Sequence, residues 1–261
     1  MTPPLFSSDR RLAARLEAAE AANAFALSRV VEDAEAEEIA GGCAVFAGVG
    51  SFLTHALGIG MAGEVTAAEF DRLEEFYRCR GGPCLIDLCP LADMSCLEQV
   101  FQRGYKVIEL NNILARPVRL YEPPAPARVR RIGPAGRETW SRVVAQGFAG
   151  SDEITPLLDQ ALGRMPLAGE SFLAESGGEA AGGGGLGLRN GVALFYADGI
   201  RPAFRRRGLQ QELIAARLHF ASEAGCDLAM VTVLPGSDSH RNYERAGFRL
   251  AYMRVNVARD A

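Results

Sequence analysis

The chain has 261 residues, of which 48% are hydrophobic, and its formal net charge is −4. This length predicts one large or two small domains, and the apolar content is ample for packed cores. The negative charge argues against a nucleic-acid-binding protein. No run reaches the roughly eighteen apolar residues of a membrane span, and residues 1–10 lack the basic start and apolar core of a signal peptide. We therefore expect a cytoplasmic protein with no membrane or nucleic-acid partner.

The six cysteines do not form a recognisable metal site. Four of them, Cys79, Cys84, Cys89 and Cys96, lie close together, but no two are spaced as Cys-x-x-Cys and only His55 is near them. This spacing is a poor match to a zinc site. In a reducing compartment we expect buried free thiols and no bound metal.

The first part of the chain alternates helical and strand patterns. Residues 8–39 are rich in Ala and Glu and predict two helices, and apolar runs at 42–47 and 52–59 predict short strands. Thr66 and Glu69 form a capping box that opens a helix to about Arg80. A strand, a helix and a long strand follow at 83–89, 92–103 and 105–116.

Residues 121–127 (YEPPAPA) predict a linker, because clustered prolines continue neither a helix nor an inner strand. A short strand at 128–132 and a helix at 137–147 come next, followed by a turn and a second helix around 155–162. From Ser171 the sequence predicts hairpin strands that turn at Gly177-Gly178 and at residues 189–191.

Within this hairpin, Gly182, Gly184 and Gly187 satisfy the Gly-x-Gly-x-x-Gly pattern of dinucleotide-binding folds. Strand and turn patterns flank these glycines, and no helix opens after them. Without a helix there is no positive helix end to bind a pyrophosphate. We therefore expect no Rossmann-type site here.

A strand–helix–strand unit forms the centre of the second half. Apolar runs at 192–197 and 228–234 predict two buried strands, and an amphipathic helix begins at Leu209 between them. Two such strands should be parallel neighbours. Arg217 falls inside the apolar sector of the helix, and the sequence offers no reason for it.

The start of this helix predicts an anion site. The first N–H groups of a helix lack intrahelical partners, and the helix dipole is positive there. Gly208 would let a phosphate approach the backbone closely, and the neighbouring arginines add positive charge. The residues of this predicted site are Arg205, Arg206, Arg207, Gly208, Leu209 and Gln210.

This stretch resembles the acyl-CoA-binding turn of the GCN5-related N-acetyltransferases, which reads Arg or Gln, two residues, Gly, one residue, then Gly or Ala. Arg205 and Gly208 fit this pattern, whereas Gln210 stands where a small residue is usual. The resemblance implies an α/β fold and acetyl-CoA as co-substrate. The alternative is a basic first turn on an ordinary helix, although like charges there oppose the dipole.

A second segment, residues 236–248, is similar to the same family. Ser239, Tyr243, Gly247 and Phe248 match its turn and short helix, while Gly236 or Ser237 replaces the usual Asn. The family implies that Ser239 contributes to cofactor binding and that Tyr243 protonates the departing CoA thiolate, as a phenol can at neutral pH. The alternative is a tyrosine whose ring packs in the core.

The remaining roles also follow from the resemblance. The backbone near Gly199 and Ile200 would pair with pantetheine. An amine acceptor must lose a proton before attack, and Asp198 and Glu153 are candidates for the base. The implied reaction is acetyl transfer from acetyl-CoA to a primary amine of a small molecule or peptide. Two other functions stay open: a CoA-binding sensor or scaffold without catalysis, and an acyltransferase of small-thiol biosynthesis.

The two halves end alike, since 104–107 and 114–116 correspond to 247–250 and 257–259 at an offset of 143 residues. We interpret this as an internal duplication rather than a coincidence of common α/β elements. The first half lacks the arginine turn, having residues 60–65 (GMAGEV) in its place, and Cys96 and Val100 stand for Ser239 and Tyr243.

The expected fold is therefore α/β, with two acetyltransferase-like domains in tandem and mixed sheets flanked by helices. Residues 1–120 would form a degenerate domain without cofactor, residues 121–127 a linker, and residues 128–261 the catalytic domain. The sequence leaves a monomer and a homodimer open, and the duplication would give one chain the paired arrangement that single-domain relatives obtain as dimers.

Overall fold

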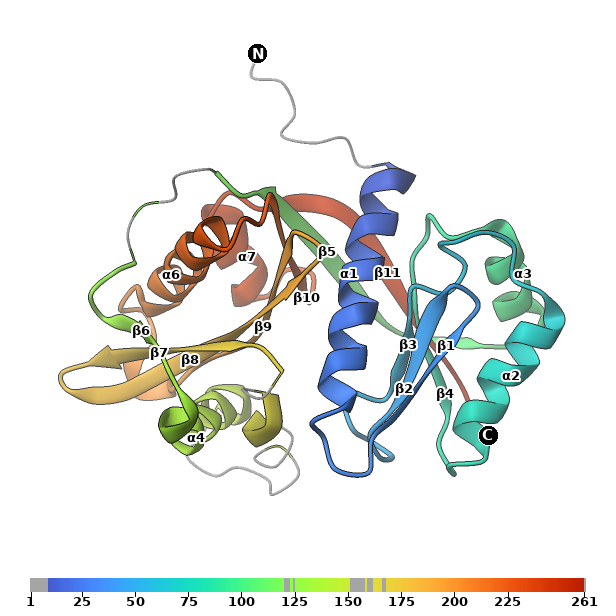
Figure 1. Ribbon diagram of the computed structural model, residues 1–261, viewed down its shortest axis with the longest axis horizontal. Coiled ribbons are helices and arrows are strands. Elements are labelled where there is room, and N and C mark those ends of the chain that lie inside the picture. Colours follow the sequence, from blue (N-terminus) through green and yellow to red (C-terminus); the bar gives the residue numbers. More distant parts are fainter. Residues whose placement is uncertain are drawn as a thin grey trace, which may run out of the picture. The chain divides into compact units, whose positions relative to one another are not determined.

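The computed structural model describes residues 9–119, 123, 125–150, 158, 162–165 and 168–260, and these form two compact units (Figure 1). Unit 1 takes the described residues up to Leu114, together with Val233–Pro235 and the residues from Leu250 onward. Unit 2 takes Ala115–Thr232 and Gly236–Arg249. The last strand of the chain thus belongs to unit 1, whereas the sequence predicted it in the second domain.

In its described residues, unit 1 consists of a mixed sheet and three helices. Its strands lie in the order β1-β2-β3-β4-β11-β5. Strands β3 and β4 are parallel, and β11 pairs antiparallel with β4. The elements are α1 (Arg10–Ser28), β1 (Glu35–Ile39), β2 (Gly42–Phe46), β3 (His55–Leu57), α2 (Ala67–Arg78), β4 (Cys84–Leu88), α3 (Met94–Gln102), β5 (Lys106–Pro117) and β11 (Arg249–Arg259).

The second helix predicted within residues 8–39 is wrong, because Glu35–Ile39 forms strand β1. This segment pairs antiparallel with β2 through a tight turn, in which Ala40 and Gly41 adopt positive φ angles of 49° and 75°. The helix propensity of Glu and Ala is a weak preference, and pairing with β2 overrides it. Arg72 of α2 also donates to Glu37 at 2.6 Å, which holds the strand against that helix.

Helix α2 begins as predicted. The Thr66 hydroxyl accepts from the Glu69 N–H at 3.2 Å, and the Glu69 carboxylate accepts from the Thr66 N–H at 2.8 Å. Its apolar side, Phe70, Leu73, Phe76 and Tyr77, is buried in a core that also contains Val257 of β11. This contribution from β11 is one reason why the C-terminal strand belongs to unit 1.

A buried charge cluster fixes β11 in unit 1. Arg254 is fully buried and lies 2.7 Å from Glu17 and 2.6 Å from Glu20, both on α1, and 3.5 Å from Asp87 on β4. Tyr252 donates to Glu17 at 2.6 Å. A buried arginine is tolerated only when carboxylates and hydrogen bonds compensate its desolvation.

We expect one part of this cluster to make stability depend on pH. His55 contacts Asp87 at 3.1 Å. Burial lowers the pKa of His55, but the Asp87 carboxylate outweighs this and the pKa is raised. A raised histidine pKa stabilises the fold fully below the unfolded pKa of about 6.5, and this stability is lost as pH rises through the folded pKa.

The variant His55→Gln should therefore lose about 1.5–3 kcal/mol at pH 6, the range for a hydrogen bond to a charged group. The difference from the native chain should shrink at pH 8.5. Urea unfolding of both chains at the two pH values measures this, and an equal loss at both would contradict the assigned cause.

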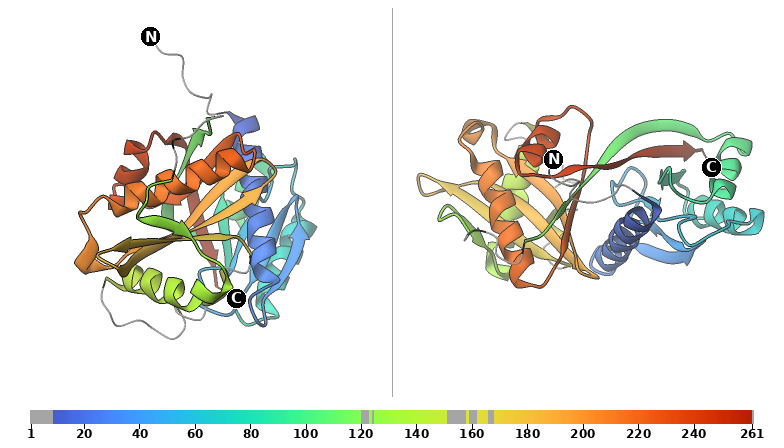
Figure 2. Two further views of the ribbon diagram at one scale, coloured as in Figure 1. Left: turned by 60° about the vertical axis from the view of Figure 1, so that its left-hand side comes forward. Right: turned by 90° about the horizontal axis from the view of Figure 1, so that it is seen from above.

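Unit 2 has strands in the order β10-β9-β8-β7-β6, and β9 and β10 are parallel as predicted. Helices α6 and α4 cover opposite faces of these strands (Figures 1 and 2). The elements are β6 (Val129–Arg131), η1 (Pro134–Gly136), α4 (Arg137–Ala149), β7 (Glu170–Ser176), β8 (Glu179–Arg189), β9 (Val192–Ile200), η3 (Pro202–Phe204), α6 (Leu209–Glu223), β10 (Leu228–Val233) and α7 (Asp238–Arg245).

The glycine motif of the hairpin lies inside strand β8 and opens no helix, as expected. Close packing explains the glycines. A Cβ at Gly183 would lie 2.7 Å from Trp140 Nε1 on one side, and a Cβ at Gly184 would lie 2.7 Å from Arg217 Cζ on the other. Side chains at these positions would displace the residues that α4 and α6 bury against the sheet.

All six cysteines are free thiols, and five of them are buried. Among the described residues, no three His, Cys, Asp or Glu side chains are grouped as metal ligands. None of the described helices has the length and apolar character that crossing a membrane requires.

Candidate functional site

The turn before α6 has the backbone geometry of an anion site. Arg206 and Gly208 both adopt positive φ angles, of 60° and 81°. A positive φ is unfavourable for a residue other than glycine, so Arg206 indicates a turn that the surrounding structure enforces. Such turns direct successive N–H groups into one concavity, where anions bind. Gly208 is the N-cap of α6, and no side chain caps the helix.

The side chains of this turn fit a phosphate group. Arg205, Arg206, Arg207 and Gly208 are exposed. Arg205 donates to the carbonyl oxygens of Ile200 and Gly147, at 3.2 and 2.9 Å, and Arg207 to that of Ala203 at 3.0 Å. Gln210 Nε2 is buried without a hydrogen-bond partner among the described residues. An unpaired donor in the first turn of the helix would be satisfied by a phosphate oxygen.

The corresponding helix of unit 1 has a different start. Helix α2 follows β3 and precedes the parallel strand β4, just as α6 lies between β9 and β10. At its N-terminus the Glu69 carboxylate already occupies the position of an anion, and its hydrogen bonds from Thr66 lower the pKa of Glu69. This helix end carries its own negative charge, which would repel a pyrophosphate.

Strand β9 separates from β10 beside this turn. The pairing of β9 with β10 ends at Phe195, opposite Val231, whereas β9 continues to Ile200. Over this last part, Gly199 and Ile200 pair with Gly183 and Gly182 of β8. The other edge of β9 is the place where an extended ligand would add hydrogen bonds in the manner of a strand.

A bulge in β9 sets the direction of Asp198. Gly183 pairs with Gly199 and Gly185 with Tyr196, so Ala197 and Asp198 together oppose Gly184. Ala197 has a φ of 54°. An extra residue in one strand bends it and re-aims the side chains nearby, and bulges of this kind are frequent next to active sites.

Asp198, Arg217 and Tyr243 meet in the interior of unit 2. Arg217 Nη2 lies 2.5 Å from Asp198 Oδ1 and 3.4 Å from the Tyr243 hydroxyl oxygen, and that hydroxyl donates to Asp198 Oδ2. Tyr243 and Arg217 have no exposed surface, while the Asp198 side chain is 11% exposed. Three elements, β9, α6 and α7, supply the cluster, which we call the Asp198 cluster.

Tyr243 keeps its proton at neutral pH. Burial raises the pKa of Tyr243 well above its usual value; the Arg217 guanidinium lowers it, and the Asp198 carboxylate raises it. The rings of Phe195 and Phe248 meet the Tyr243 ring edge to face, with centroids 5.9 and 5.0 Å away. The Tyr243 ring thus packs in the core, and its hydroxyl lies in a polar cluster.

The structure brings some of the predicted residues together and leaves others apart. Asp198 and Tyr243 are in contact. Ser239 lies on α7, half-buried, one turn before Tyr243. Glu153 and the turn around it lie outside the described residues. Sequence reasoning missed the contribution of Arg217, although an arginine in the apolar sector of α6 was the available signal.

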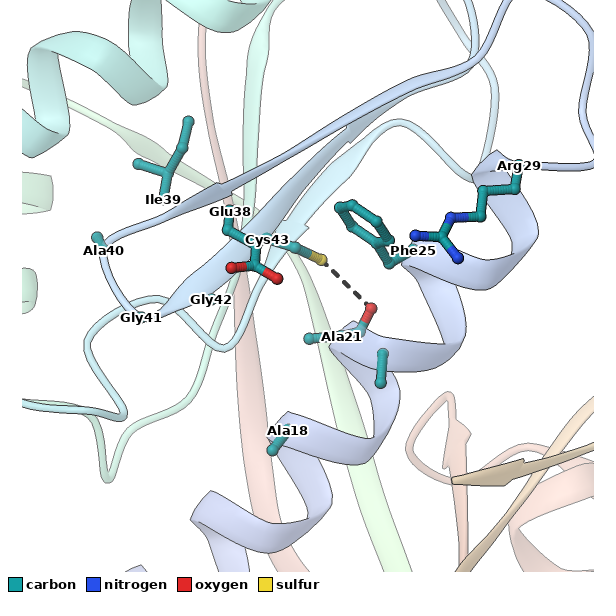
Figure 3. A pocket seen from close by; sticks show the side chains of 11 residues that line it. Ala18, Ala21, Phe25, Arg29, Glu38, Ile39, Ala40, Gly41, Gly42 and Cys43 are labelled. Atoms are coloured by element: carbon teal, nitrogen blue, oxygen red, sulfur yellow. Dashed lines mark hydrogen bonds between the residues drawn. The ribbon is translucent and has the colours of Figure 1, made fainter. Parts of the chain in front are cut away.

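A separate pocket of about 560 Å³ lies in unit 1 (Figure 3). It is open between α1 and the β1–β2 hairpin, and small residues line it together with Phe25, Ile39 and the charged side chains of Arg29 and Glu38. Cys43 points toward α1 and donates to the carbonyl of Ala21 at 3.4 Å. Burial raises the pKa of this thiol to about 12, so Cys43 is not a nucleophile at neutral pH.

Comparison with known proteins gives the family of unit 2. Residues 142–248 match the model of the acetyltransferase (GNAT) family. This range contains the α6 turn, the β9 bulge and the Asp198 cluster. This part of the chain is therefore similar to GNAT acetyltransferase domains. A search of the curated proteins found no significant match.

Solved structures extend the likeness to most of the chain. A GCN5-related N-acetyltransferase from Kribbella flavida is similar over 96% of this chain and 96% of its own, with a TM-score of 0.70 and 19% identity. One from Sphaerobacter thermophilus covers 74% and 67%, with a TM-score of 0.54 and 16% identity. A tandem GNAT protein from the clavulanic acid biosynthesis pathway covers 98% and 97%, with a TM-score of 0.58 and 13% identity. At these identities the likeness is one of fold, and it confirms the predicted α/β class with two GNAT-like domains in tandem.

Proposed function

We propose that the protein is an N-acetyltransferase that moves an acetyl group from acetyl-CoA to a primary amine of a small molecule or peptide. The observation that carries this proposal is the start of α6, an uncapped helix end with exposed arginines and an unpaired Gln210 amide. Positive charge and free N–H groups at one point suit a pyrophosphate. Unit 2 would bind acetyl-CoA. The protein would be a monomer or a homodimer and would be located in the cytoplasm.

Each predicted residue has a role in this proposal. Acetyl-CoA would supply an activated acetyl group, and CoA would leave as a thiolate. The turn Arg205–Gln210 would hold the phosphates, with Ser239 close to them, and the free edge of β9 at Gly199 and Ile200 would hold the pantetheine arm. Tyr243 would give the proton on its hydroxyl oxygen to the leaving group and regain one from solvent.

The base that deprotonates the amine is assigned by elimination. Asp198 Oδ2 accepts the hydroxyl proton of Tyr243, and Asp198 Oδ1 faces Arg217 in an ion pair. Asp198 thus contacts the proposed proton donor to the thiolate. We therefore place Asp198 on the side of the leaving group and propose Glu153, the other candidate, as the base for the amine.

We further propose that unit 1 is a degenerate repeat without cofactor. Both units place a helix between two parallel strands, but α2 begins with the Thr66–Glu69 capping box, and the turn before it, residues 60–65, contains no arginine. The chemistry would then belong to unit 2 alone, as the contrast between the two helix ends supports.

Thermal unfolding with acetyl-CoA tests the cofactor assignment. We expect ligand at 100 times its Kd to stabilise the native chain by about 2.7 kcal/mol. The variant Gly208→Glu should lose this stabilisation, because it places a carboxylate at the uncapped helix end where the phosphates would lie.

The matched control is Gly81→Glu. Gly81 is also exposed and has a φ of 72°, and a Cβ at this position would have no other atom within 4 Å. Gly81 lies in unit 1 and is not part of the proposed cofactor turn. Both variants carry the same strain from a positive φ, so only the ligand response separates them. Absence of stabilisation in the native chain at millimolar acetyl-CoA would refute the proposed function.

The burial of the Asp198 cluster also favours a second candidate, a CoA-binding sensor without catalysis. Tyr243 has no exposed surface, and its hydroxyl proton is directed to Asp198. Acetyl-CoA binding with no free CoA released in the presence of any amine from a broad panel would support the sensor. Release of CoA that depends on an amine would exclude it.

A further inference from the structure

Arg217 is a buried charge for which the apolar packing of α6 gives no reason. Its side chain is fully buried, and its donors reach three elements: Nε the Leu213 carbonyl at 3.0 Å, Nη1 the Gly185 carbonyl at 3.0 Å, and Nη2 the Asp198 carboxylate. The guanidinium also lies 4.6 Å from the centroid of the Phe195 ring. Burying an ion pair gains little stability over well-packed apolar residues. A role other than stability is therefore the better explanation.

The neighbouring strands are built around this ion pair. A Cβ at Gly184 would lie 2.6 Å from Asp198 Oδ1 and 2.7 Å from Arg217 Cζ. Only a glycine leaves space for both groups. On the other side, the bulge at Ala197 turns Asp198 toward α6. The glycine-rich part of β8 thus makes room for a polar group.

Arg217 and Asp198 together determine the hydrogen bonding and the electrostatic surroundings of the Tyr243 hydroxyl. Among the described residues, Arg217 is the cation that contacts its hydroxyl, and Asp198 accepts the proton of that hydroxyl. When a phenol gives up its proton, a buried negative charge develops on its oxygen. Burial and Asp198 both oppose that charge, whereas Arg217 favours it. Without Arg217, Tyr243 would face an uncompensated carboxylate.

We propose that Arg217 is a positioning residue of the transfer site, which holds Asp198 against Tyr243 and stabilises negative charge on the Tyr243 oxygen. The structural half of this inference, that Arg217 holds Asp198 against Tyr243, rests on the contacts alone. The catalytic half rests on the proposed acetyltransferase function, in which Tyr243 is the proton donor.

Steady-state kinetics in two backgrounds test the catalytic half. We expect Arg217→Met to lower kcat by about 10- to 100-fold, part of the range for general acid catalysis. The KM for acetyl-CoA should change little, because Arg217 lies two turns away from the start of α6. Arg217→Lys keeps the charge and should recover part of kcat. In a Tyr243→Phe background, Arg217→Met should cause no further loss, since both changes remove the same proton transfer.

A merely structural role predicts a different result. If Arg217 only fills the interior, Arg217→Met lowers kcat by the same factor in the Tyr243 and Tyr243→Phe backgrounds, and Arg217→Lys gives no recovery. That outcome would overturn the proposal.

Proton NMR tests the structural half without any turnover. A buried hydroxyl that donates to a carboxylate should give a slowly exchanging resonance, assigned by its absence in Tyr243→Phe. We expect Arg217→Lys to keep this resonance and Arg217→Met to lose it. If Arg217→Met does not fold, Arg217→Gln removes the charge, keeps a hydrogen-bond donor and leaves the Asp198 acceptor in place, and it should also lose the resonance. A resonance that persists in the folded Met variant would overturn the positioning role.

These readouts separate the two proposals. If no amine is acetylated while the hydroxyl resonance depends on Arg217, the proposed function fails and the positioning of Tyr243 stands. If acetylation proceeds but the resonance and kcat are independent of Arg217, the positioning role fails and the acetyltransferase stands.

Discussion

Replacing Tyr243 with phenylalanine is expected to lower kcat for amine acetylation by about 10²- to 10⁴-fold, the usual contribution of a general acid. The phenol is buried and protonated, and it lies at the end of a fixed hydrogen-bonded cluster. The substitution removes one oxygen and keeps the ring in its contacts with Phe195 and Phe248. Free CoA release with acetyl-CoA and a responsive amine measures kcat.

Binding provides the control for this variant. Stabilisation by acetyl-CoA should equal that of the native chain, because the α6 turn is untouched. The matched variant Tyr252→Phe in unit 1 also removes a buried phenol oxygen, one that donates to Glu17 at 2.6 Å, and should leave kcat unchanged. If Tyr243→Phe turned over as fast as the native chain, Tyr243 would have no part in the mechanism and would only pack in the core.

Replacing Arg254 with methionine is expected to destabilise unit 1 by about 3–5 kcal/mol, the cost of breaking a buried ion pair from one side. Three carboxylates, those of Glu17, Glu20 and Asp87, would lose their shared cation. Hydrogen exchange of the β11 and β4 amides reports this locally, since these strands pair at Val255–Arg259 and Cys84–Leu88.

A control on the same strand separates burial from charge. Arg259 pairs with Glu74 at 2.6 Å, but its side chain is 43% exposed. Arg259→Met should therefore cost less than about 1 kcal/mol. Equal losses in the two variants would contradict the role we assign to burial.

The cost of Arg254→Met should fall as the solution becomes more acidic. Burial raises the pKa of Glu17, and Arg254 partly lowers it again, so removal of the arginine raises it further. A carboxyl with a raised folded pKa binds more protons in the folded state, and it loses stability as pH rises from the unfolded to the folded pKa. A cost that is independent of pH would show that lost packing, not charge, is responsible.

Local signals in the sequence predicted local structure well. The capping box at Thr66 and Glu69, the hairpin turns at Gly177 and Asn190, and the helix from Leu209 to Glu223 all depend on neighbours a few residues apart. The exception is Glu35–Ile39, whose composition favours a helix but which lies next to β2. Its strand pairing is a tertiary interaction, and composition does not encode it.

The candidate site also has a part that depends on neighbouring residues and a part that depends on tertiary contacts. The turn at Arg205–Gln210, which we propose binds the phosphates, could be singled out from sequence, because a helix start and its charges lie within one short segment. The Asp198 cluster joins residues 19 to 45 positions apart, from three elements. Only the β9 bulge and the space left by Gly184 decide that these side chains meet.

The sequence by itself determined the family resemblance, the elements of both halves and the helix end suited to a phosphate, because each of these is set by short-range pattern and charge. Tertiary structure decided that the last strand belongs to unit 1, where Arg254 meets carboxylates from α1 and β4. It also decided that Arg217 is a partner of Tyr243. Both outcomes depend on ion pairs between buried side chains that are far apart in the sequence, and no local pattern specifies such a pair.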